Sequence, residues 1–501
     1  MSIDPVMLRL TVGGLAAACE EMGELLVRAA ASANIKERRD CSTGLFDAAG
    51  QMTMQAAHIP VHLGAMPASV EAVVAEDHAA GDAWILNDPF RGGTHLPDIT
   101  LVTPVFADSG SLLGFAACRA HHADVGGREP GSMPADSRTL AEEGVVIPPT
   151  RIASSGRLDT DLIDSIVGQM RGPDLRRADL RAQLAACRRG EQRIREFAEK
   201  YGEDRYREAT SAVLDYAEAL TRDGLRSIPD GEYTATDQLE SIDGPIELRL
   251  TATVDGDSVT LDFSGSAQQV AGNLNCPLAV TRSAGYFAIR VLASADAPAC
   301  AGAYRPIEVI APQGSILNAL PPAAVAAGNV ETSSRVADLV LAAFGRAQGQ
   351  GTMNNLTLGN ERFTHYETFG GGQGACPHAP GPSAVHVAMS NTLNTPVEAL
   401  EIEFPLRVRE YSVRRGSGGR GRHNGGDGIV RSVEALEDMR YSLIAERRAR
   451  QPRGAEGGEH GACGADFIDG EPIPGKSVGS LPAGAVLRLE TPGGGACGTN
   501  L

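Results

Sequence analysis

Two His-x-x-Asp units, each beside glycine-rich sequence, are the residues of this chain best suited to chemistry. They are His95-Leu96-Pro97-Asp98 and His121-His122-Ala123-Asp124, and apolar segments typical of β-strands separate them. Imidazole nitrogens and carboxylate oxygens are the ligands that divalent Zn or Mn accepts. Two such units at neighbouring strand ends would therefore form a metal site. On spacing alone a second interpretation stays open, in which these are loop residues that satisfy backbone groups and cap helices.

The segment between the two units predicts how they would meet. Residues 102–106 alternate in the manner of a strand, and residues 112–117 form a second strand candidate. If the two strands pair as a hairpin, their open ends meet at one edge of the sheet. Such a hairpin would bring the two His-x-x-Asp units together.

The rest of the chain predicts a mixed α/β fold (α+β) with several lobes and mixed sheets. Apolar residues recur at helical spacing in residues 5–33 and 175–226. Residues 246–263 alternate in the manner of a β-hairpin, and residues 397–500 contain short strands and dense turns. We divide the chain into four regions: a metal-site α/β lobe (1–170), a long helical hairpin (171–228), a second α/β lobe (229–396) and a β-rich C-terminal region (397–501).

Composition and charge exclude several classes of protein. The 501 residues carry a net charge of −18, and such an acidic surface repels phosphate backbones, so nucleic acid is not an expected partner. No apolar run reaches the length of a membrane span, and the first residues do not resemble a signal peptide. The nine cysteines are scattered without a Cys-x-x-Cys pair, which indicates reduced thiols. We therefore expect a cytoplasmic protein without a membrane segment.

Further histidines near the two units are additional candidates for the site. His58 and His62 form a His-x₃-His pair that would share one face of a helix, although Pro60 favours an extended loop. His122 competes with His121 as the imidazole that faces the site. The residue types alone do not choose between them.

Two short patterns look like catalytic motifs but lack the elements that those motifs need. Residues 470–477 fit the P-loop pattern, yet Pro472 and Pro474 remove two of the N–H groups that would bind phosphate, and no good helix can start after them. Residues 475–479 mimic a nucleophile elbow and lack the same strand–turn–helix context. We interpret both as turns in a β region and expect no nucleotide-binding site in this chain.

A third segment, Gly328-Asn329-Val330-Glu331-Thr332-Ser333, leads into a predicted helix. Thr332 or Ser333 would suit the N-cap position. The N-terminus of this helix could face a substrate, although capping alone explains these residue types.

An ordered series of short segments spans almost the whole chain. The most distinctive are residues 37–42, 58–64, 88–98, 121–127, 130–134, 328–333 and 391–398. The series resembles the hydantoinase B/oxoprolinase family, which includes the B subunit of N-methylhydantoinase, the C-terminal half of 5-oxoprolinase, a caprolactamase subunit and the α subunit of acetone carboxylase. So many matches in order are more specific than any single motif.

The resemblance implies a metal centre. Carried over residue by residue, it puts the metal ligands at His95, Asp98 and His121, and it favours His121 over His122. Asp124 would be a fourth ligand or a group that orients an imidazole. We therefore expect a divalent ion, Mn or Zn, with His121 and Asp124 as catalytic residues.

The resemblance also implies a division of labour with an A-type subunit that binds ATP and phosphorylates the carbonyl oxygen of a cyclic amide. The leading hypothesis is that this chain is the B-type subunit, which hydrolyses the activated species with water whose pKa the ion lowers. A first alternative is a subunit of an acetone- or acetophenone-type carboxylase. A second is a non-catalytic assembly partner.

Overall fold

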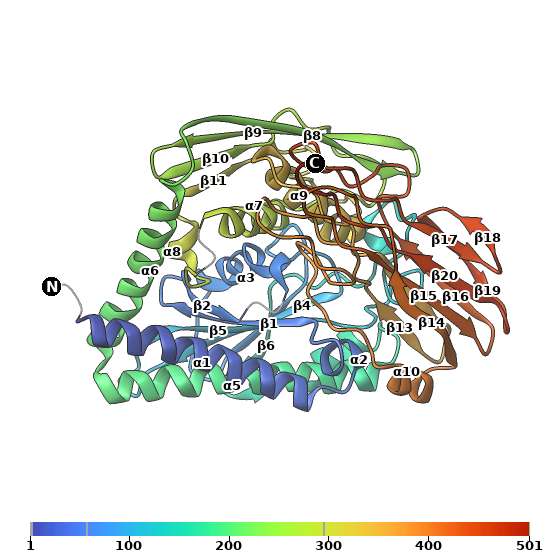
Figure 1. The fold of residues 1–501 in the computed structure, drawn as a ribbon. Coiled ribbons are helices and arrows are strands. Elements are labelled where there is room, and N and C mark those ends of the chain that lie inside the picture. Colours follow the sequence, from blue (N-terminus) through green and yellow to red (C-terminus); the bar gives the residue numbers. More distant parts are fainter. Residues whose placement is uncertain (1–3, 57–58, 294–295, 500–501) are drawn as a thin grey trace.

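The computed structural model describes residues 4–56, 59–293 and 296–499, and it combines four sheets with helices packed against them (Figure 1). This architecture confirms the predicted mixed α/β class. None of the helices within these ranges combines the length and the apolar character needed to cross a membrane.

The first sheet has seven strands, and every neighbouring pair in it is antiparallel. Its order is β2 (Met52–Ala56), β1 (Cys41–Asp47), β5 (Leu112–His121), β4 (Asp98–Phe106), β3 (Ala83–Leu86), β6 (Thr150–Ser154) and β7 (Arg157–Leu158). The predicted hairpin is the β4–β5 pair at the centre of this sheet. Both strands are buried almost throughout, because helices cover both faces of the sheet.

Two long helices, α1 (Pro5–Ala29) and α5 (Pro173–Tyr201), cover one face of this sheet, and α3 (Ala65–Val74) lies on the other (Figure 1). The apolar stripe of α5 faces the strands. A Cβ at Gly190 would lie only 2.6 Å from Met22 Sδ and 2.9 Å from Ala116 Cβ, so glycine is what lets α5 approach both α1 and β5 this closely.

The region predicted as a helical hairpin consists of α5 and α6 (Glu203–Leu225), which are joined at Gly202. In Figure 1, α6 rises steeply from the end of α5 toward the second sheet. It therefore connects the first lobe with the second. Shorter elements of the first lobe are α2 (Ala33–Lys36), α4 (Thr160–Val167) and the 3₁₀ turns Pro60–His62 and Leu140–Glu142.

The second lobe is a four-stranded sheet with helices on one face. Its order is β11 (Ile307–Ile310), β10 (Ser258–Asp262), β9 (Gly244–Asp255) and β8 (Gly231–Ser241), and only the β10–β11 pair is parallel. The predicted hairpin over residues 246–263 is the β9–β10 pair, and its alternating residues are buried. The helices of this lobe are α7 (Leu278–Ala293), α8 (Ala301–Tyr304) and α9 (Ser333–Ala343).

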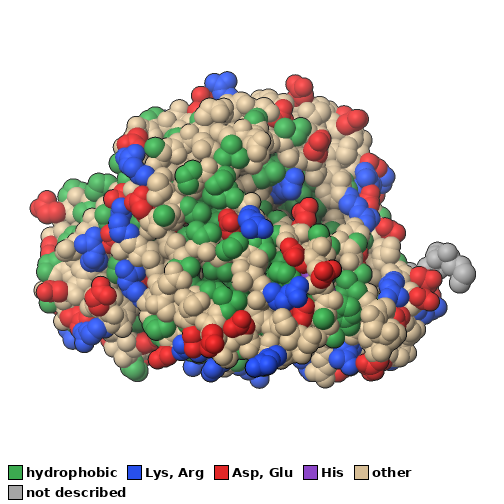
Figure 2. Space-filling model, turned by 180° about the vertical axis from the view of Figure 1, so that it is seen from behind, with side chains coloured by type: hydrophobic (Ala, Val, Ile, Leu, Met, Phe, Trp, Pro, Cys, Tyr) green, Lys and Arg blue, Asp and Glu red, His purple; other side chains and the backbone are tan. Residues whose placement is uncertain are grey.

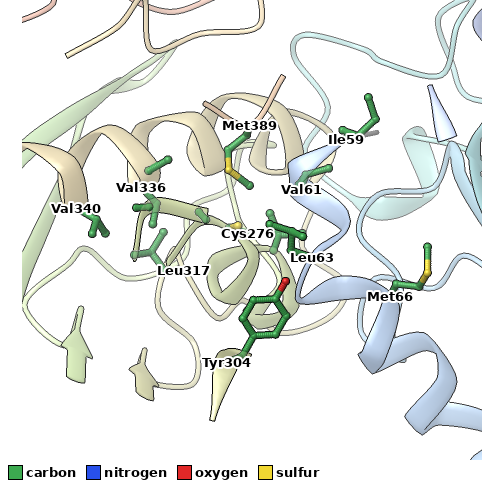
Figure 3. Packing of buried hydrophobic residues seen from close by; sticks show 14 of the residues in the cluster. Ile59, Val61, Leu63, Met66, Cys276, Tyr304, Leu317, Val336, Val340 and Met389 are labelled. Carbon is green, nitrogen blue, oxygen red and sulfur yellow. The ribbon is translucent and has the colours of Figure 1, made fainter. Parts of the chain in front are cut away.

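The first two lobes share one apolar core. In Figure 3, Leu63 of the first lobe lies beside Cys276, and Leu317 and Val336 of the second lobe belong to the same buried cluster. The lobes are thus packed together through buried side chains, and the N-terminus of α9 is held close to the first sheet.

The C-terminal region contains two sheets, as its turn-rich sequence predicts. One has the order β13 (Thr364–Glu367), β12 (Asn355–Gly359), β16 (Met439–Ile444) and β19 (Lys476–Leu481); the other has the order β14 (Leu406–Arg414), β15 (Gly428–Ala435), β20 (Val486–Glu490), β17 (Ala465–Ile468) and β18 (Glu471–Ile473). A short helix, α10 (Val397–Glu403), precedes β14. Strands β12 and β13 come before residue 397, so this region draws in chain that the sequence assigned to the preceding lobe.

The P-loop look-alike forms strands β18 and β19 with a turn between them. The amine of Lys476 donates hydrogen bonds to the carbonyl oxygens of Glu240 and Ala445 and to the carboxylate of Glu446. The segment lies in a β region, as predicted, but most of it is strand rather than turn, and the lysine amine is already bound within the protein.

The surface carries apolar side chains as well as charges. Figure 2 shows a face on which apolar side chains gather in the hollowed centre, with acidic and basic side chains around it. Exposed apolar area of this kind is common on proteins that bind partners.

Candidate metal centre

The β4–β5 hairpin brings three of the predicted ligands together at one edge of the first sheet. Asp98 is the first residue of β4 and His121 is the last of β5, and the two lie directly opposite each other in the register. His95 reaches them through a tight turn in which the N–H of Asp98 donates to the carbonyl of His95. Asn87 holds this loop, since its side chain donates to Leu96 O at 2.8 Å and to Val145 O at 2.9 Å.

The three side chains have the spacing of ligands around one ion. His95 Nε2 and His121 Nδ1 are 3.2 Å apart, and they lie 3.4 Å and 3.5 Å from Asp98 Oδ1. Ligands about 2.1 Å from an ion lie about 3.0 Å apart at an octahedral angle and about 3.4 Å apart at a tetrahedral angle. No main-chain movement is needed to bring the three donor atoms around a cation.

The charge states of the group also suit a cation. Burial lowers the pKa of His121 to about 3, so its imidazole is neutral at physiological pH and keeps a free lone pair. Burial opposes ionisation of Asp98, but His95 and hydrogen bonds from His121 and His62 hold its pKa well below the usual range. Neutral imidazole and ionised carboxylate are the forms that bind divalent metals.

Neighbouring side chains fix the orientation of the carboxylate and of one ring. Thr94 Oγ1 donates to Asp98 Oδ2 at 2.6 Å, and His62 Nε2 lies 3.4 Å from the same oxygen, so Oδ1 is the oxygen turned toward the two imidazoles. The ring of Tyr366 stacks on His121 with centroids 4.4 Å apart and planes 11° apart. Such support is typical of metal ligands in proteins.

The ligand atoms face a small buried cavity of about 20 Å³ that includes Asp40, His62, Asn329 and Tyr366 in its wall. A space of this size holds about one water molecule. Burial raises the pKa of Asp40 to about 7, against an opposing effect of Arg38. A cation in the cavity would lower that pKa again, because an adjacent positive charge favours the ionised carboxylate.

The predicted site residue Asp124 lies apart from the three ligand residues. The Asp124 carboxylate accepts hydrogen bonds from the N–H groups of Gly126 and Gly131, both at 2.7 Å, and pairs with Arg171 at 3.1 Å. It organises the loop after β5 and makes no hydrogen bond or ion pair to the three ligand residues in the described part of the chain. We therefore drop the sequence-based assignment of Asp124 as a ligand or catalytic group.

The two neighbouring histidines, His121 and His122, face opposite sides of the sheet. His122 follows His121 but points the other way, and its Nε2 lies 2.8 Å from Gln183 Oε1 of α5. Successive residues of a strand face opposite sides of a sheet, so only one of the two can face the cavity, and it is His121. His62 joins the group as a partner of Asp98, and His58 lies outside the described residues.

Sequence reasoning missed Asp40 and Asn329 as wall residues of the cavity. Asp40 directly precedes β1, and the N–H of His121 donates to its carbonyl at 3.0 Å. Pairing of β1 with β5 would have predicted this position, but no pattern in the sequence selects that pair. Asn329 lies in the segment that we expected to be a helix cap.

The comparisons with known proteins agree with this architecture. The family model for hydantoinase B/oxoprolinase matches residues 4–500. The chain belongs to this family. It is 39% identical to 5-oxoprolinase 1 of Arabidopsis thaliana over 96% of its own length and 41% of the relative's, and 37% identical to an uncharacterised protein of Methanocaldococcus jannaschii over 96% of its own length and 88% of the relative's.

Solved structures extend the likeness to three dimensions. The fold matches an ATP-dependent caprolactamase from Pseudomonas jessenii with a TM-score of 0.92 and 25% identity, over 100% of this chain and 92% of that one. It also matches acetone carboxylase with a TM-score of 0.90 and 17% identity, over 99% of this chain and 76% of that one, a likeness of fold alone. The chain spans about two fifths of the 5-oxoprolinases that it matches.

Proposed function

We propose that this chain is the B-type component of an ATP-dependent hydrolase of cyclic amides. The observation that carries the proposal is the buried His95–Asp98–His121 group with ligand spacing, in a chain related to proteins named 5-oxoprolinase and similar in structure to a caprolactamase. An unstrained amide resists water, so its ring opening needs activation.

We assign the ion to His95 Nε2, Asp98 Oδ1 and His121 Nδ1. A divalent cation held there would polarise an oxygen of the substrate and lower the pKa of water. The protein itself would hold the ligand side chains in position. Thr94 and His62 hold the outer oxygen of Asp98, and Tyr366 holds the ring of His121.

A second component is proposed because the chain spans about two fifths of the 5-oxoprolinases that it matches. The remaining part of those proteins would correspond to an A-type ATP-binding subunit that activates the substrate. The only P-loop-like sequence that we identified here has its lysine amine bound to Glu446 and to backbone carbonyls. This supports a division in which ATP acts on the partner.

The cavity is smaller than any cyclic amide, so substrate binding must displace part of its wall. Met353, Thr368 and Thr392 of this wall lie outside the described strands, so we expect the wall to open there. We expect the ligand residues to stay in place, because β4 and β5 lie in the middle of the sheet.

The test is ring opening by the chain combined with an A-type subunit and Mg-ATP, with hydantoin, 5-oxoproline and caprolactam as substrates. We expect turnover only when both proteins and ATP are present. His121→Ala should abolish ring opening while some uncoupled ATP hydrolysis remains, whereas the matched control His122→Gln, one residue away and facing α5, should keep most activity. Ring opening by this chain without ATP or partner would contradict the proposal.

The carboxylase alternative predicts a different product from the same site. Its support is the fold that the chain shares with acetone carboxylase. Incubation of the two subunits with ATP, a ketone and labelled bicarbonate would give a labelled acid under that alternative and none under the hydrolase proposal.

A further inference from the structure

The helix α9 does not begin as an ordinary α-helix. Residues Gly328–Thr332 form a π-helical turn, which continues directly into α9. Such turns are rare and are frequently found at functional sites. The expected capping bonds from Thr332 or Ser333 are absent within this described segment, and their hydroxyls instead donate to Leu274 O at 2.7 Å and Asn329 O at 2.5 Å.

This π-turn places the carboxamide of Asn329 against the metal centre. Asn329 Nδ2 lies 3.3 Å from His95 Nε2, and the side chain is in the wall of the same cavity. Asn329 is only 3% exposed, and its Oδ1 has no hydrogen-bond partner among the described residues. An unsatisfied buried polar group costs about 1–3 kcal/mol, so this amide is poorly explained as a structural group.

The position of the amide is tightly held. The N–H of Gly328 donates to Asn273 O at 2.9 Å. A Cβ at Gly328 would lie 1.8 Å from the carbonyl oxygen of Asn275, so the turn packs directly against the neighbouring backbone. Asn329 is therefore presented to the cavity by a rigid support.

A second side chain of the turn supports the other imidazole. Glu331 Oε1 accepts a hydrogen bond from Asn355 Nδ2 at 3.0 Å, and Asn355 Oδ1 accepts one from the hydroxyl of Tyr366 at 2.7 Å. Tyr366 in turn stacks on His121. The same short turn thus touches His95 directly and His121 through two intermediates.

The hydrogen bond between Asn329 and His95 cannot coexist with an ion on the same nitrogen. His95 Nε2 has one lone pair, and an ion bound there would occupy it. The Asn329 N–H would then need another acceptor. A molecule bound in the cavity of about 20 Å³ would supply it. Loading of the site therefore converts Asn329 into a free hydrogen-bond donor beside the ligands.

We propose that Asn329 is a substrate-contacting residue whose amide N–H donates to the oxygen carried by the reacting carbon of the activated cyclic amide. This rests on the proposed function. An amide donor does not titrate, and it binds an oxygen more strongly as negative charge develops on that oxygen.

The test compares Asn329→Ala and Asn329→Asp with wild type. Ser334→Ala is the control for disturbance of the turn, because Ser334 Oγ donates to Val330 O. Titration with MnCl₂ comes first. We expect Asn329→Ala to bind Mn²⁺ within about threefold of wild type. A loss of tenfold or more would overturn the proposal and make Asn329 a metal ligand.

Kinetics with the A-type subunit and ATP come second. Removal of one such donor lowers kcat by about 100-fold or more in other enzymes, so we expect a loss of at least that size in kcat/KM in both Asn329 variants, with Ser334→Ala close to wild type. Asn329→Asp has the same shape without the N–H donor, and near-normal kcat/KM in that variant would overturn the proposal.

A binding measurement separates this proposal from the proposed function. Hydantoin is titrated into the Mn²⁺-loaded chain by calorimetry, and its affinity should fall at least tenfold in Asn329→Ala. If wild type opens no ring with its partner, the proposed function fails. Unchanged hydantoin affinity in Asn329→Ala, or no binding to wild type, would overturn the role of Asn329 by itself.

Discussion

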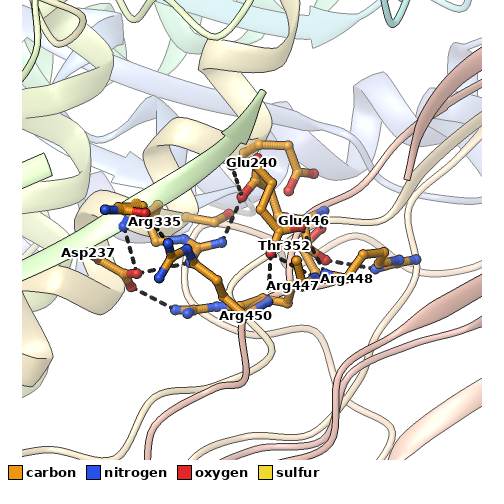
Figure 4. A network of polar contacts seen from close by, with 12 residues as sticks. Asp237, Glu240, Arg335, Thr352, Glu446, Arg447, Arg448 and Arg450 are labelled. Atoms are coloured by element: carbon orange, nitrogen blue, oxygen red, sulfur yellow. Dashed lines mark hydrogen bonds and ion pairs between the residues drawn. The ribbon is translucent and has the colours of Figure 1, made fainter. Parts of the chain in front are cut away.

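The protein contains two buried polar clusters that differ in how their charged and polar side chains are paired. Around His95, Asp98 and His121, two imidazoles and a carboxylate face a cavity. In the second cluster (Figure 4), Arg335 binds Asp237 and Glu446 at 3.3 Å and 2.8 Å. One cluster faces a cavity, and the other pairs its charges with one another, although Arg335 Nε and Arg447 Nε lack hydrogen-bond partners among the described residues.

The ionic cluster connects the C-terminal region to the second lobe. Arg447 pairs with Asp237 of β8 at 3.1 Å and with Asp338 of α9 at 3.0 Å, and Lys476 of β19 pairs with Glu446. The helix α9 belongs to both clusters, because its N-terminal π-turn carries Asn329. The ion pairs of Arg335 and Arg447 therefore hold α9 in place, and the π-turn that precedes α9 contacts His95 of the candidate metal centre.

The largest expected effect comes from breaking the ionic cluster. Glu446→Ala would leave Arg335 and Lys476 buried without this carboxylate, which should lower the free energy of unfolding by about 3–5 kcal/mol. Urea denaturation measures this free energy of unfolding. The control is Arg138→Ala, which removes a pair whose side chains are 56% and 62% exposed and should cost about 0–1 kcal/mol. A loss below about 1 kcal/mol in Glu446→Ala would remove the contrast between the clusters.

Metal should stabilise the site cluster and leave the ionic cluster unaffected. At 100 times the dissociation constant, a bound ion should add about 2.7 kcal/mol to the unfolding free energy of wild type. Asp98→Asn should lose this gain, because it removes the negative charge of the carboxylate ligand. The equally buried Asp82→Asn, whose carboxylate binds the N–H groups of Ala79 and Ser155, should keep it. Equal gains in both variants would contradict the ligand assignment.

A smaller effect should come from the pH dependence of Glu331, which lies between the two clusters. Burial, with the nearby Glu446, raises the pKa of Glu331 from 4.5 to about 7. The folded state then holds this proton more firmly than the unfolded state. Its contribution to stability is complete below about pH 4.5 and is lost as the pH rises through about 7, by up to about 1.4 kcal/mol per pH unit.

Glu331→Gln should remove this part of the pH dependence while keeping the acceptor for Asn355. Urea unfolding at pH 5.5, 6.5 and 7.5 would show wild type losing stability relative to the variant as the pH rises. Parallel curves would show that Glu331 does not titrate in this range.

No effect at all is expected for nucleotide. Calorimetry of the chain alone with Mg-ATP should show no saturable binding, since Lys476 already binds Glu446. Saturable binding that Lys476→Ala removes would assign this residue to a nucleotide site after all.

The sequence predicted the parts of the site that depend on local pattern. Alternation in residues 102–106 and 112–117 gave the hairpin, and the hairpin register placed Asp98 opposite His121. Spacing could not show that the chain turns after His122 and directs Asp124 into a loop with Arg171. It also could not predict Asp40 or Asn329, because their positions depend on the β1–β5 pairing and on the packing of α9 against the first lobe.

The central claim is most directly tested by the metal content of the purified chain. Elemental analysis after equilibration with Mn²⁺ or Zn²⁺ and removal of free ion should find about one ion per chain. His95→Ala and Asp98→Ala should hold none while remaining folded, and the matched control His122→Gln should hold as much as wild type. Wild type that takes up no ion, or variants that retain a full complement, would contradict the assignment of His95, Asp98 and His121 as the metal centre.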